Sequence, residues 1–502
     1  MTRVFSPLTL GAKDCVTGSC HLFRANGANI MVDCGRPQGR DACVPMENWP
    51  IKPSEIDYLF LTHAHIDHIG RVPEMIQNGF KGEIIATHPT KALLVPMLED
   101  ALSFTPMPRA EADRIIQSID DLSWGFEYGE TFELRKGIHF RMGNAGHILG
   151  SCFLRLEVQT QPPLTPNPAA TPNPAPATRH PSSALCHPSS VFCHPSSVFI
   201  THNPLPGASH PSPWTVIFSG DLGAKNTPLL PDPDPPGSCD LLVLESTYGD
   251  RLHEEREHRT RRLGEILTRA LSDRGKVFIP AFALGRAQEL IYELDRLVSD
   301  PGLQRAFPAL TCKKVPVCVD SPLGLELTRI YSGLKPYWDA EARQLLRRGD
   351  NPLDFDQLYA VRSHQDHVRL LEMPGPAVII AGSGMCTGGR IVDHLKTGLQ
   401  DPRNDVLFVG YQARGTAGRE IIEYAKSPAG YVNLDGENIP IRAGVHNLTG
   451  YSAHADQREL LEWVRSMPEK PGCIRLVHGE PPAQAVLAAH LRREGYAVDD
   501  GP

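Results

Sequence analysis

Four side chains that commonly bind metal ions lie within six residues of an early segment. The run His63-Ala64-His65-Ile66-Asp67-His68 follows the apolar residues 58–61, which predict a short buried strand. His63 and His65 alternate on an extended backbone and so face the same way, whereas Asp67 and His68 lie past a bend. Imidazole and carboxylate ligands together suit zinc, with manganese or iron as alternatives. The run therefore predicts a dinuclear centre.

Three further candidate ligands each follow a segment that predicts a strand. His147 follows residues 143–146, Asp221 follows residues 217–220, and His478 follows residues 474–477. A lone histidine or aspartate is more often structural than a ligand. Together with the first run, however, these three complete a ligand set large enough for two ions.

Composition narrows the class of protein. The chain has 502 residues, of which 41% are hydrophobic and 22% charged, which is typical of a globular protein with two or three domains. The net charge of -8 argues against a protein that coats nucleic acid through bulk positive charge, although a local groove of arginines would still serve a nuclease. No run of about eighteen apolar residues predicts a membrane span, and residues 1–22 lack an apolar leader, so we expect a cytoplasmic protein.

Strands and helices alternate in the second half of the chain. Strand patterns at residues 275–280, 315–319 and 377–381 are each followed by helical spacing, at residues 287–297, 323–330 and 391–395. This order predicts a parallel α/β sheet, and we place this second domain at residues 249–434.

Residues 159–213 have a different composition from the rest of the chain. Prolines recur every few residues, and three near-identical heptads begin at His180, His187 and His194. Such proline density predicts a loosely extended surface loop, here inserted between strands at residues 152–158 and 214–218. Histidines and cysteines seven residues apart on such a backbone lack the geometry of known metal sites, so we expect an insertion without function.

Several motifs together resemble a known family. The run at residues 63–68, with Asp33, His147 and Asp221, resembles the metallo-β-lactamase superfamily. The segments Glu245-Ser246-Thr247-Tyr248-Gly249, Ser452-Ala453-His454-Ala455-Asp456 and Val477-His478-Gly479-Glu480 resemble motifs A, B and C of its RNA-cleaving β-CASP branch, which includes the cleavage-and-polyadenylation endonuclease and shorter bacterial relatives. The resemblance implies an α/β fold. A four-layer αββα metallo-β-lactamase domain, residues 1–248 and 435–502, is split by an inserted β-CASP domain.

The resemblance also implies a set of site residues and a cofactor of two Zn²⁺ ions. One ion would be held by His63, His65 and His147, the other by Asp67, His68 and His478, with Asp221 bridging them and Asp33 orienting ligands by hydrogen bonds. His454 would protonate the leaving oxygen and Glu245 would tune it, with Asp67 also at the catalytic centre. RNA contacts are expected from the β-CASP side: Ser383, Gly384, Met385, Arg390, Arg414 and Thr416.

The implied function is a zinc-dependent ribonuclease that hydrolyses phosphodiester bonds of single-stranded RNA with a metal-bridged hydroxide, in RNA processing or decay. A 5′-phosphate and a 3′-hydroxyl are the implied products, and endonuclease action is favoured over 5′-exonuclease action. The alternatives are a small-molecule metallohydrolase, a DNA-directed β-CASP nuclease and an inactive scaffold. A motif C histidine, His478, favours RNA over DNA by analogy, and every ligand is retained. Assembly as a homodimer or within an RNA-processing complex stays open.

Overall fold

The computed structural model describes residues 6–135, 137–159, 213–254, 258–312 and 315–499. Two β-sheets lie face to face at its centre. The first sheet has six strands in the order β1 (Leu8–Gly11), β2 (Cys20–Ala25), β3 (Ala28–Cys34), β4 (Tyr58–Phe60), β5 (Glu83–Thr87) and β6 (Ser123–Phe126). The second has seven, in the order β21 (Val498–Asp499), β20 (Cys473–Val477), β11 (Leu241–Glu245), β10 (Trp214–Phe218), β9 (Cys152–Val158), β8 (Ile138–Asn144) and β7 (Thr131–Glu133).

Apolar side chains alternate along these strands and fill the space between the sheets. Phe23, Ile30 and Phe60 from the first sheet pack against Phe140 and Phe218 from the second. Because neighbouring residues of a strand point to opposite faces, each sheet also presents an outer apolar face that a helical layer must cover.

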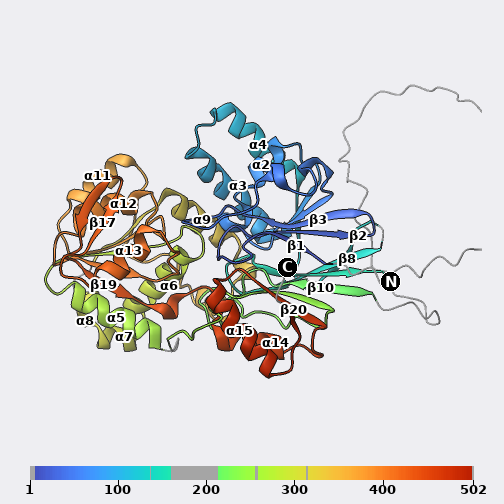
Figure 1. Cartoon of the computed structure of the whole chain (residues 1–502). Helices are drawn as coiled ribbons and strands as arrows, with labels where there is room; N and C mark the ends of the chain where they lie inside the picture. Colours follow the sequence, from blue (N-terminus) through green and yellow to red (C-terminus); the bar gives the residue numbers. More distant parts are fainter. Residues whose placement is uncertain (1–5, 136, 160–212, 255–257, 313–314, 500–502) are drawn as a thin grey trace, which may run out of the picture.

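Helices cover both outer faces and complete four layers (Figure 1). On the first sheet they are α1 (Ile66–Ile69), α2 (Val72–Gln77), α3 (His88–Ser103) and α4 (Arg109–Leu122). On the second they are α14 (Gln457–Arg465) and α15 (Pro481–Arg493), whose Leu460, Trp463 and Leu487 pack on Leu242 and Ile474. The αββα expectation is confirmed. No helix in the described ranges is long and apolar enough to cross a membrane.

A third sheet forms the inserted domain. Its six parallel strands have the order β14 (Leu358–Ala360), β13 (Val317–Asp320), β15 (Ala377–Ala381), β12 (Lys276–Pro280), β16 (Asp405–Phe408) and β19 (Gly444–Asn447). One face packs on α5 (Arg259–Ala270), α6 (Arg286–Ser299) and α9 (Pro322–Gly333). The other packs on α11 (His364–Glu372), α12 (Arg390–Gly398) and α13 (Ala417–Tyr424). Smaller elements are α7 (Pro301–Ala306), α8 (Pro308–Cys312), α10 (Ala340–Arg347) and the hairpin β17 (Tyr431–Leu434) and β18 (Glu437–Pro440).

The chain leaves the first domain after β11 and returns to it through α14, which precedes β20. Strand β20 then pairs with β11 in parallel. The third sheet also extends past residue 434, where we expected the domain to end, because β19 pairs with β16 along residues 444–447. A four-residue strand carries too weak an apolar pattern to predict that pairing. The proline-rich segment interrupts neighbours as expected: β9 and β10 are antiparallel, with Val158 opposite Trp214. Residues 160–212 lie outside the described residues.

Candidate dinuclear metal centre and its groove

The candidate ligands lie where strands of the two central sheets end. The segment 61–65 follows β4, His147 follows β8, Asp221 follows β10 and His478 follows β20. Since β10, β11 and β20 are parallel, their carboxyl ends meet at one edge of the second sheet. Gly223 lets the loop after β10 pack against the loop that carries His147, because a Cβ at Gly223 would overlap the carbonyl of Gly146.

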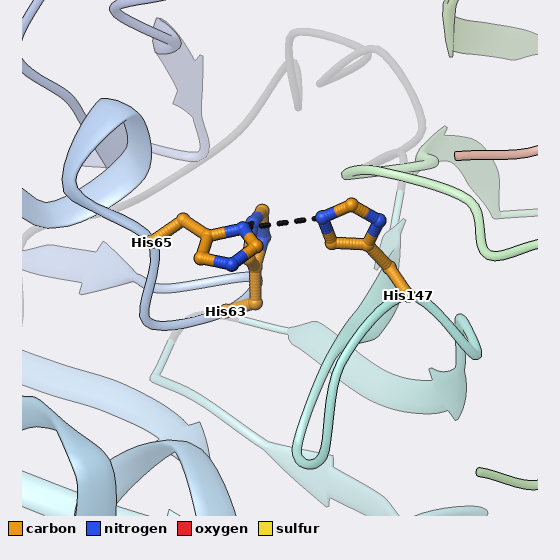
Figure 2. Close-up of side chains that lie close together, drawn as sticks. All are labelled: His63, His65 and His147. Atoms are coloured by element: carbon orange, nitrogen blue, oxygen red, sulfur yellow. Dashed lines mark hydrogen bonds between the residues drawn. The ribbon is translucent and has the colours of Figure 1, made fainter. Parts of the chain in front are cut away.

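Three imidazoles converge in the first cluster (Figure 2). His65 Nδ1 lies 3.1 Å from both His63 Nε2 and His147 Nε2. The other ring nitrogen of His65 lies 3.4 Å from the carbonyl of Leu284, so a hydrogen on Nε2 leaves the Nδ1 lone pair facing the cluster. The cluster thus presents three nitrogens to one point, although His65 uses Nδ1 where the other two use Nε2.

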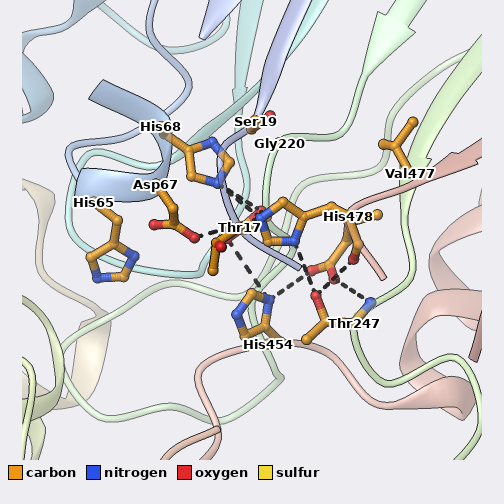
Figure 3. Close-up of polar contacts among 12 residues, drawn as sticks. Thr17, Ser19, His65, Asp67, His68, Gly220, Thr247, His454, Val477 and His478 are labelled. Carbon is orange, nitrogen blue, oxygen red and sulfur yellow. Dashed lines mark hydrogen bonds and ion pairs between the residues drawn. The ribbon is translucent and has the colours of Figure 1, made fainter. Parts of the chain in front are cut away.

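Asp67, His68 and His478 form the second cluster (Figure 3). His68 Nε2 lies 3.2 Å from His478 Nε2, which in turn lies 3.7 Å from Asp67 Oδ2. Asp33 accepts a hydrogen bond of 2.8 Å from His68 Nδ1, which directs the lone pair of Nε2 into the cluster.

Asp221 joins the two clusters through its separate carboxylate oxygens. Its Oδ2 lies 3.6 Å from the Nε2 atoms of His63 and His147, whereas its Oδ1 lies 3.3 Å from His68 Nε2 and 3.6 Å from His478 Nε2. The side chain is 2% exposed, and Oδ1 accepts no well-formed hydrogen bond from any described residue. A buried carboxylate oxygen between imidazole lone pairs is a poor hydrogen-bond site and a good cation site, so the residues present fit metal binding.

The charges around the clusters support the same conclusion. Burial would raise the pKa of Asp221, but the nearby histidines outweigh it and hold the pKa well below its usual value. Burial lowers the pKa of His63 well below its usual value, and burial also lowers the pKa of His147. Burial would lower the pKa of His68 too, but the carboxylates of Asp221 and Asp33 outweigh it and hold that pKa well above its usual value. The ionised carboxylate of Asp221 and the neutral imidazoles of His63 and His147 therefore suit a metal ion, whereas His68 would release a proton on binding one.

His454 lies beside the clusters and is held by Glu245. Its Nδ1 is 3.2 Å from Glu245 Oε1 and 3.9 Å from Asp221 Oδ2. Burial opposes the charged imidazole, but the carboxylates of Glu245 and Asp221 outweigh it and raise the pKa of His454. Backbone hydrogen bonds from Ala224 to Ala453 and from Ala455 to Leu222 fix the turn that carries His454.

A cavity of about 900 Å³ lies between the two domains, over both clusters. His65, Asp67, His147, Asp221 and His454 line it from the first domain. Four expected RNA contacts line it from the β-CASP side, namely Ser383, Gly384, Met385 and Arg390. The sequence-predicted residues of the two domains therefore meet in one groove.

Two of the expected RNA contacts are placed differently. Arg414 forms an ion pair of 2.9 Å with Glu480, which also accepts a hydrogen bond from Tyr411. Thr416 is 1% exposed, and its hydroxyl donates to Ala413 and accepts from the amide of Arg419 at the start of α13. Neither residue is among the described residues that line the cavity. Thr416 thus caps a helix, a role that its position before residues 417–424 could have predicted.

Sequence reasoning missed two hydroxyls that hold the ligands. Thr62 Oγ1 lies 2.9 Å from Asp33 Oδ2 and 3.2 Å from His63 Nδ1, and Thr247 Oγ1 lies 3.2 Å from His478 Nδ1. Thr62 directly precedes the run at residues 63–68, and Thr247 lies inside the segment 245–249, so their places beside candidate site residues were the signal that could have identified them.

Comparisons with known proteins agree with this geometry. Residues 14–159 match the model of the metallo-beta-lactamase superfamily, residues 287–421 that of the Beta-Casp domain, and residues 438–499 that of the Zn-dependent metallo-hydrolase RNA specificity domain. Ribonuclease TTHA0252 of Thermus thermophilus is 35% identical over 97% of this chain and 96% of its own length. The chain belongs to the β-CASP family of the metallo-β-lactamase superfamily.

Other relatives of this β-CASP protein are longer. Transcription termination factor FttA of Methanocaldococcus jannaschii is 28% identical over 96% of this chain and 68% of its own length. Cleavage and polyadenylation specificity factor 73 of Drosophila melanogaster is 28% identical over 98% of this chain and 62% of its own length. A crystal structure of a protein of unknown function from Enterococcus faecalis shares the fold, with a TM-score of 0.50 at 11% identity over 99% of this chain and 98% of that one.

Proposed function

We propose that this β-CASP protein is a zinc-dependent ribonuclease that cleaves single-stranded RNA, with endonuclease action favoured. One observation carries the proposal. Asp221 directs its two carboxylate oxygens at two separate ligand clusters on the floor of a groove shared by both domains. That arrangement supports a dinuclear centre with room above it for a chain-like substrate. The similarity to Ribonuclease TTHA0252 over nearly the whole of both chains supports RNA as the substrate.

His63, His65 and His147 would hold one zinc ion, Asp67, His68 and His478 the other, and Asp221 both. Bound there, the pair of ions would activate water and stabilise the charge that develops on the phosphate oxygens. The protein keeps the ligands in the correct tautomer: the carbonyl of Leu284 and the carboxylate of Asp33 each occupy the ring nitrogen that faces away from the cluster.

His454 donates the proton that the leaving 3′-oxygen needs. The carboxylate of Glu245 is hydrogen-bonded to Nδ1 of the His454 imidazole, so Nε2 is the nitrogen that donates the proton. The carboxylate of Glu245 raises the pKa of His454, which favours the protonated form that a general acid must hold before the reaction. The products are an RNA with a 5′-phosphate and an RNA with a 3′-hydroxyl.

The β-CASP side of the groove binds the phosphate backbone. Arg390 is one-fifth exposed and lines the cavity, and Ser383 presents a hydroxyl that already accepts from the amide of Thr387. Charge-assisted and hydroxyl donors of this kind suit phosphate oxygens without reading the sequence of the bases. Such a groove suits an enzyme of RNA processing or decay, and the cytoplasm is the compartment that we propose for it.

The test uses purified protein with RNA and DNA of one sequence, each single-stranded and labelled at one end. Cleavage of RNA that a chelator stops and added zinc restores supports the proposal. A circular RNA has no free 5′ end, so its conversion to linear products would distinguish endonuclease from 5′-exonuclease action. Preferred cleavage of the DNA would favour the DNA-directed alternative, and hydrolysis of a β-lactam or thioester with no nuclease activity would favour a small-molecule enzyme.

A further inference from the structure

A second cluster of buried ionisable groups lies in the β-CASP domain, beside the groove. Asp320 ends strand β13, is 0% exposed and receives three side-chain donors. His367 Nδ1 and His394 Nε2 lie 2.6 Å and 2.7 Å from its Oδ2, and Arg390 Nη1 lies 2.6 Å from its Oδ1. Both histidines are buried as well. None of these four groups touches the candidate zinc ligands in any contact that the described residues make.

The distances favour a hydrogen-bond network over a third metal site. Asp320, His367 and His394 are residue types that bind metals and lie close enough together to do so. However, 2.6–2.7 Å from nitrogen to oxygen is the length of a direct charge-assisted hydrogen bond. The guanidinium of Arg390 already balances the carboxylate charge, so a divalent cation there would face a fixed positive neighbour.

The network fixes one edge of the Arg390 guanidinium. Besides Asp320, Nη1 donates to the carbonyl of Val361 at 3.1 Å, and Nη2 donates to the carbonyl of Arg362 at 3.2 Å. These bonds occupy the end of the guanidinium group that is formed by Nη1 and Nη2. The side edge, formed by Nε and the second hydrogen of Nη2, is left for a ligand, and that edge has the spacing of two phosphate oxygens.

The network also holds the helix that follows the glycine-rich loop. Arg390 is the first residue of α12, and His394 lies one turn later on the same face, so Asp320 contacts α12 at both positions. His367 contacts the same carboxylate from α11 and reaches Asp393 through Nε2 at 3.2 Å. The amide of Ile391 donates to Gly382 at 2.9 Å, which connects α12 to the loop that carries Ser383.

We propose that Asp320 is a positioning residue for substrate binding: with His367 and His394 it holds Arg390 so that the side edge of its guanidinium receives an RNA phosphate. The inference rests on the proposed ribonuclease function. It adds three residues to the groove that contact no substrate themselves and act only through Arg390.

The test compares Asp320→Asn, Arg390→Ala and the double variant, each loaded with zinc, in steady-state cleavage of single-stranded RNA. Asp320→Asn should raise KM about tenfold, the usual effect of losing one hydrogen bond to a charged group, with kcat within about threefold of wild type. Zinc content should not change. In the Arg390→Ala background, Asp320→Asn should raise KM less than about twofold further, since the residue through which it acts is already gone.

Asp405→Asn is a matched control. Asp405 also accepts a 2.6 Å hydrogen bond from a histidine, His446. However, Asp405 is the first residue of β16, so it lies at the amino-terminal end of the parallel strands, away from the groove at their carboxyl ends. Its replacement should leave KM near the wild-type value. On the histidine side, His394→Gln keeps a donor for Asp320 and should retain a lower KM than His394→Leu, which has none. This pair keeps the test decisive if Asp320→Asn does not fold.

Three results would overturn the inference. Asp320→Asn could lower thermal stability while KM stays unchanged, which would make the network purely structural. Its effect on KM could be as large in the Arg390→Ala background as in the wild type. The wild type could also bind a third metal ion that Asp320→Asn loses. Failure of the proposed function looks different, because the wild-type protein would then cleave no RNA at all.

Discussion

Replacement of His454 by alanine should separate proton donation from metal binding. His454 Nδ1 lies 3.2 Å from Glu245 and 3.9 Å from Asp221, whereas the His68 and His478 nitrogens lie 3.2 Å apart within their cluster. Removing the imidazole leaves Glu245 with amide donors from Leu222 at 2.8 Å and Thr247 at 3.2 Å, so its buried carboxylate stays hydrogen-bonded. We therefore expect the fold and the zinc content to persist.

The expected loss in cleavage rate is about 10²- to 10⁴-fold, the usual contribution of a positioned proton donor. At 1.36 kcal/mol for each factor of ten, this corresponds to about 2.7 to 5.4 kcal/mol of barrier. The high end applies here, because the His454 side chain is only 14% exposed, which limits its replacement by bulk water.

The assay compares normal RNA with an RNA whose leaving 3′-oxygen is replaced by sulfur. A thiolate leaves without protonation, so His454→Ala and wild type should cleave this substrate at nearly equal rates. His478→Ala is the control, because it removes a candidate ligand and should lower zinc content and impair both substrates. If His454→Ala is as impaired on the sulfur substrate as on normal RNA, His454 is not the proton donor, and a role in holding the phosphate is preferred.

Three other predictions follow from the same contacts. Metal analysis should give about two zinc ions per chain, and Asp221→Ala should lower the occupancy of both sites since its oxygens serve both clusters, whereas loss of one ion alone would contradict a bridge. Because Val158 and Trp214 are opposite one another, replacing residues 159–213 with Asn-Gly should leave RNA cleavage within about threefold of wild type. A larger loss in a folded variant would show that the segment serves substrate or partner binding. Burial and the nearby Asp350 raise the pKa of Asp295 to about 7. Between pH 3.8 and pH 7 the folded protein therefore keeps a proton on Asp295 that the unfolded chain has released, so the stability of the fold falls as the pH rises through this range. Asp295→Asn should then stabilise the protein by about 2 to 4 kcal/mol at pH 8 and little at pH 4 in denaturant unfolding, and an equal gain at both pH values would refute this cause.

Local sequence determined the chemistry of the site. Metal-binding residue types packed into residues 63–68, and single ligands placed after apolar runs, indicate strand ends that carry ligands. The alternation of strand and helix patterns likewise predicts the parallel sheet of the second domain. Such features are readable because the periodicity of a strand or helix depends on residues a few positions apart.

Tertiary structure decided how those residues combine. His478 reaches Asp221 and completes the second cluster only because β20 pairs with β11, a contact between residues more than two hundred positions apart. The choice of Nδ1 on His65 depends on the carbonyl of Leu284, and the Asp320 network depends on helices packing on the third sheet. No short window of sequence records these contacts, because long-range pairing is selected by the burial of whole faces rather than by any local pattern.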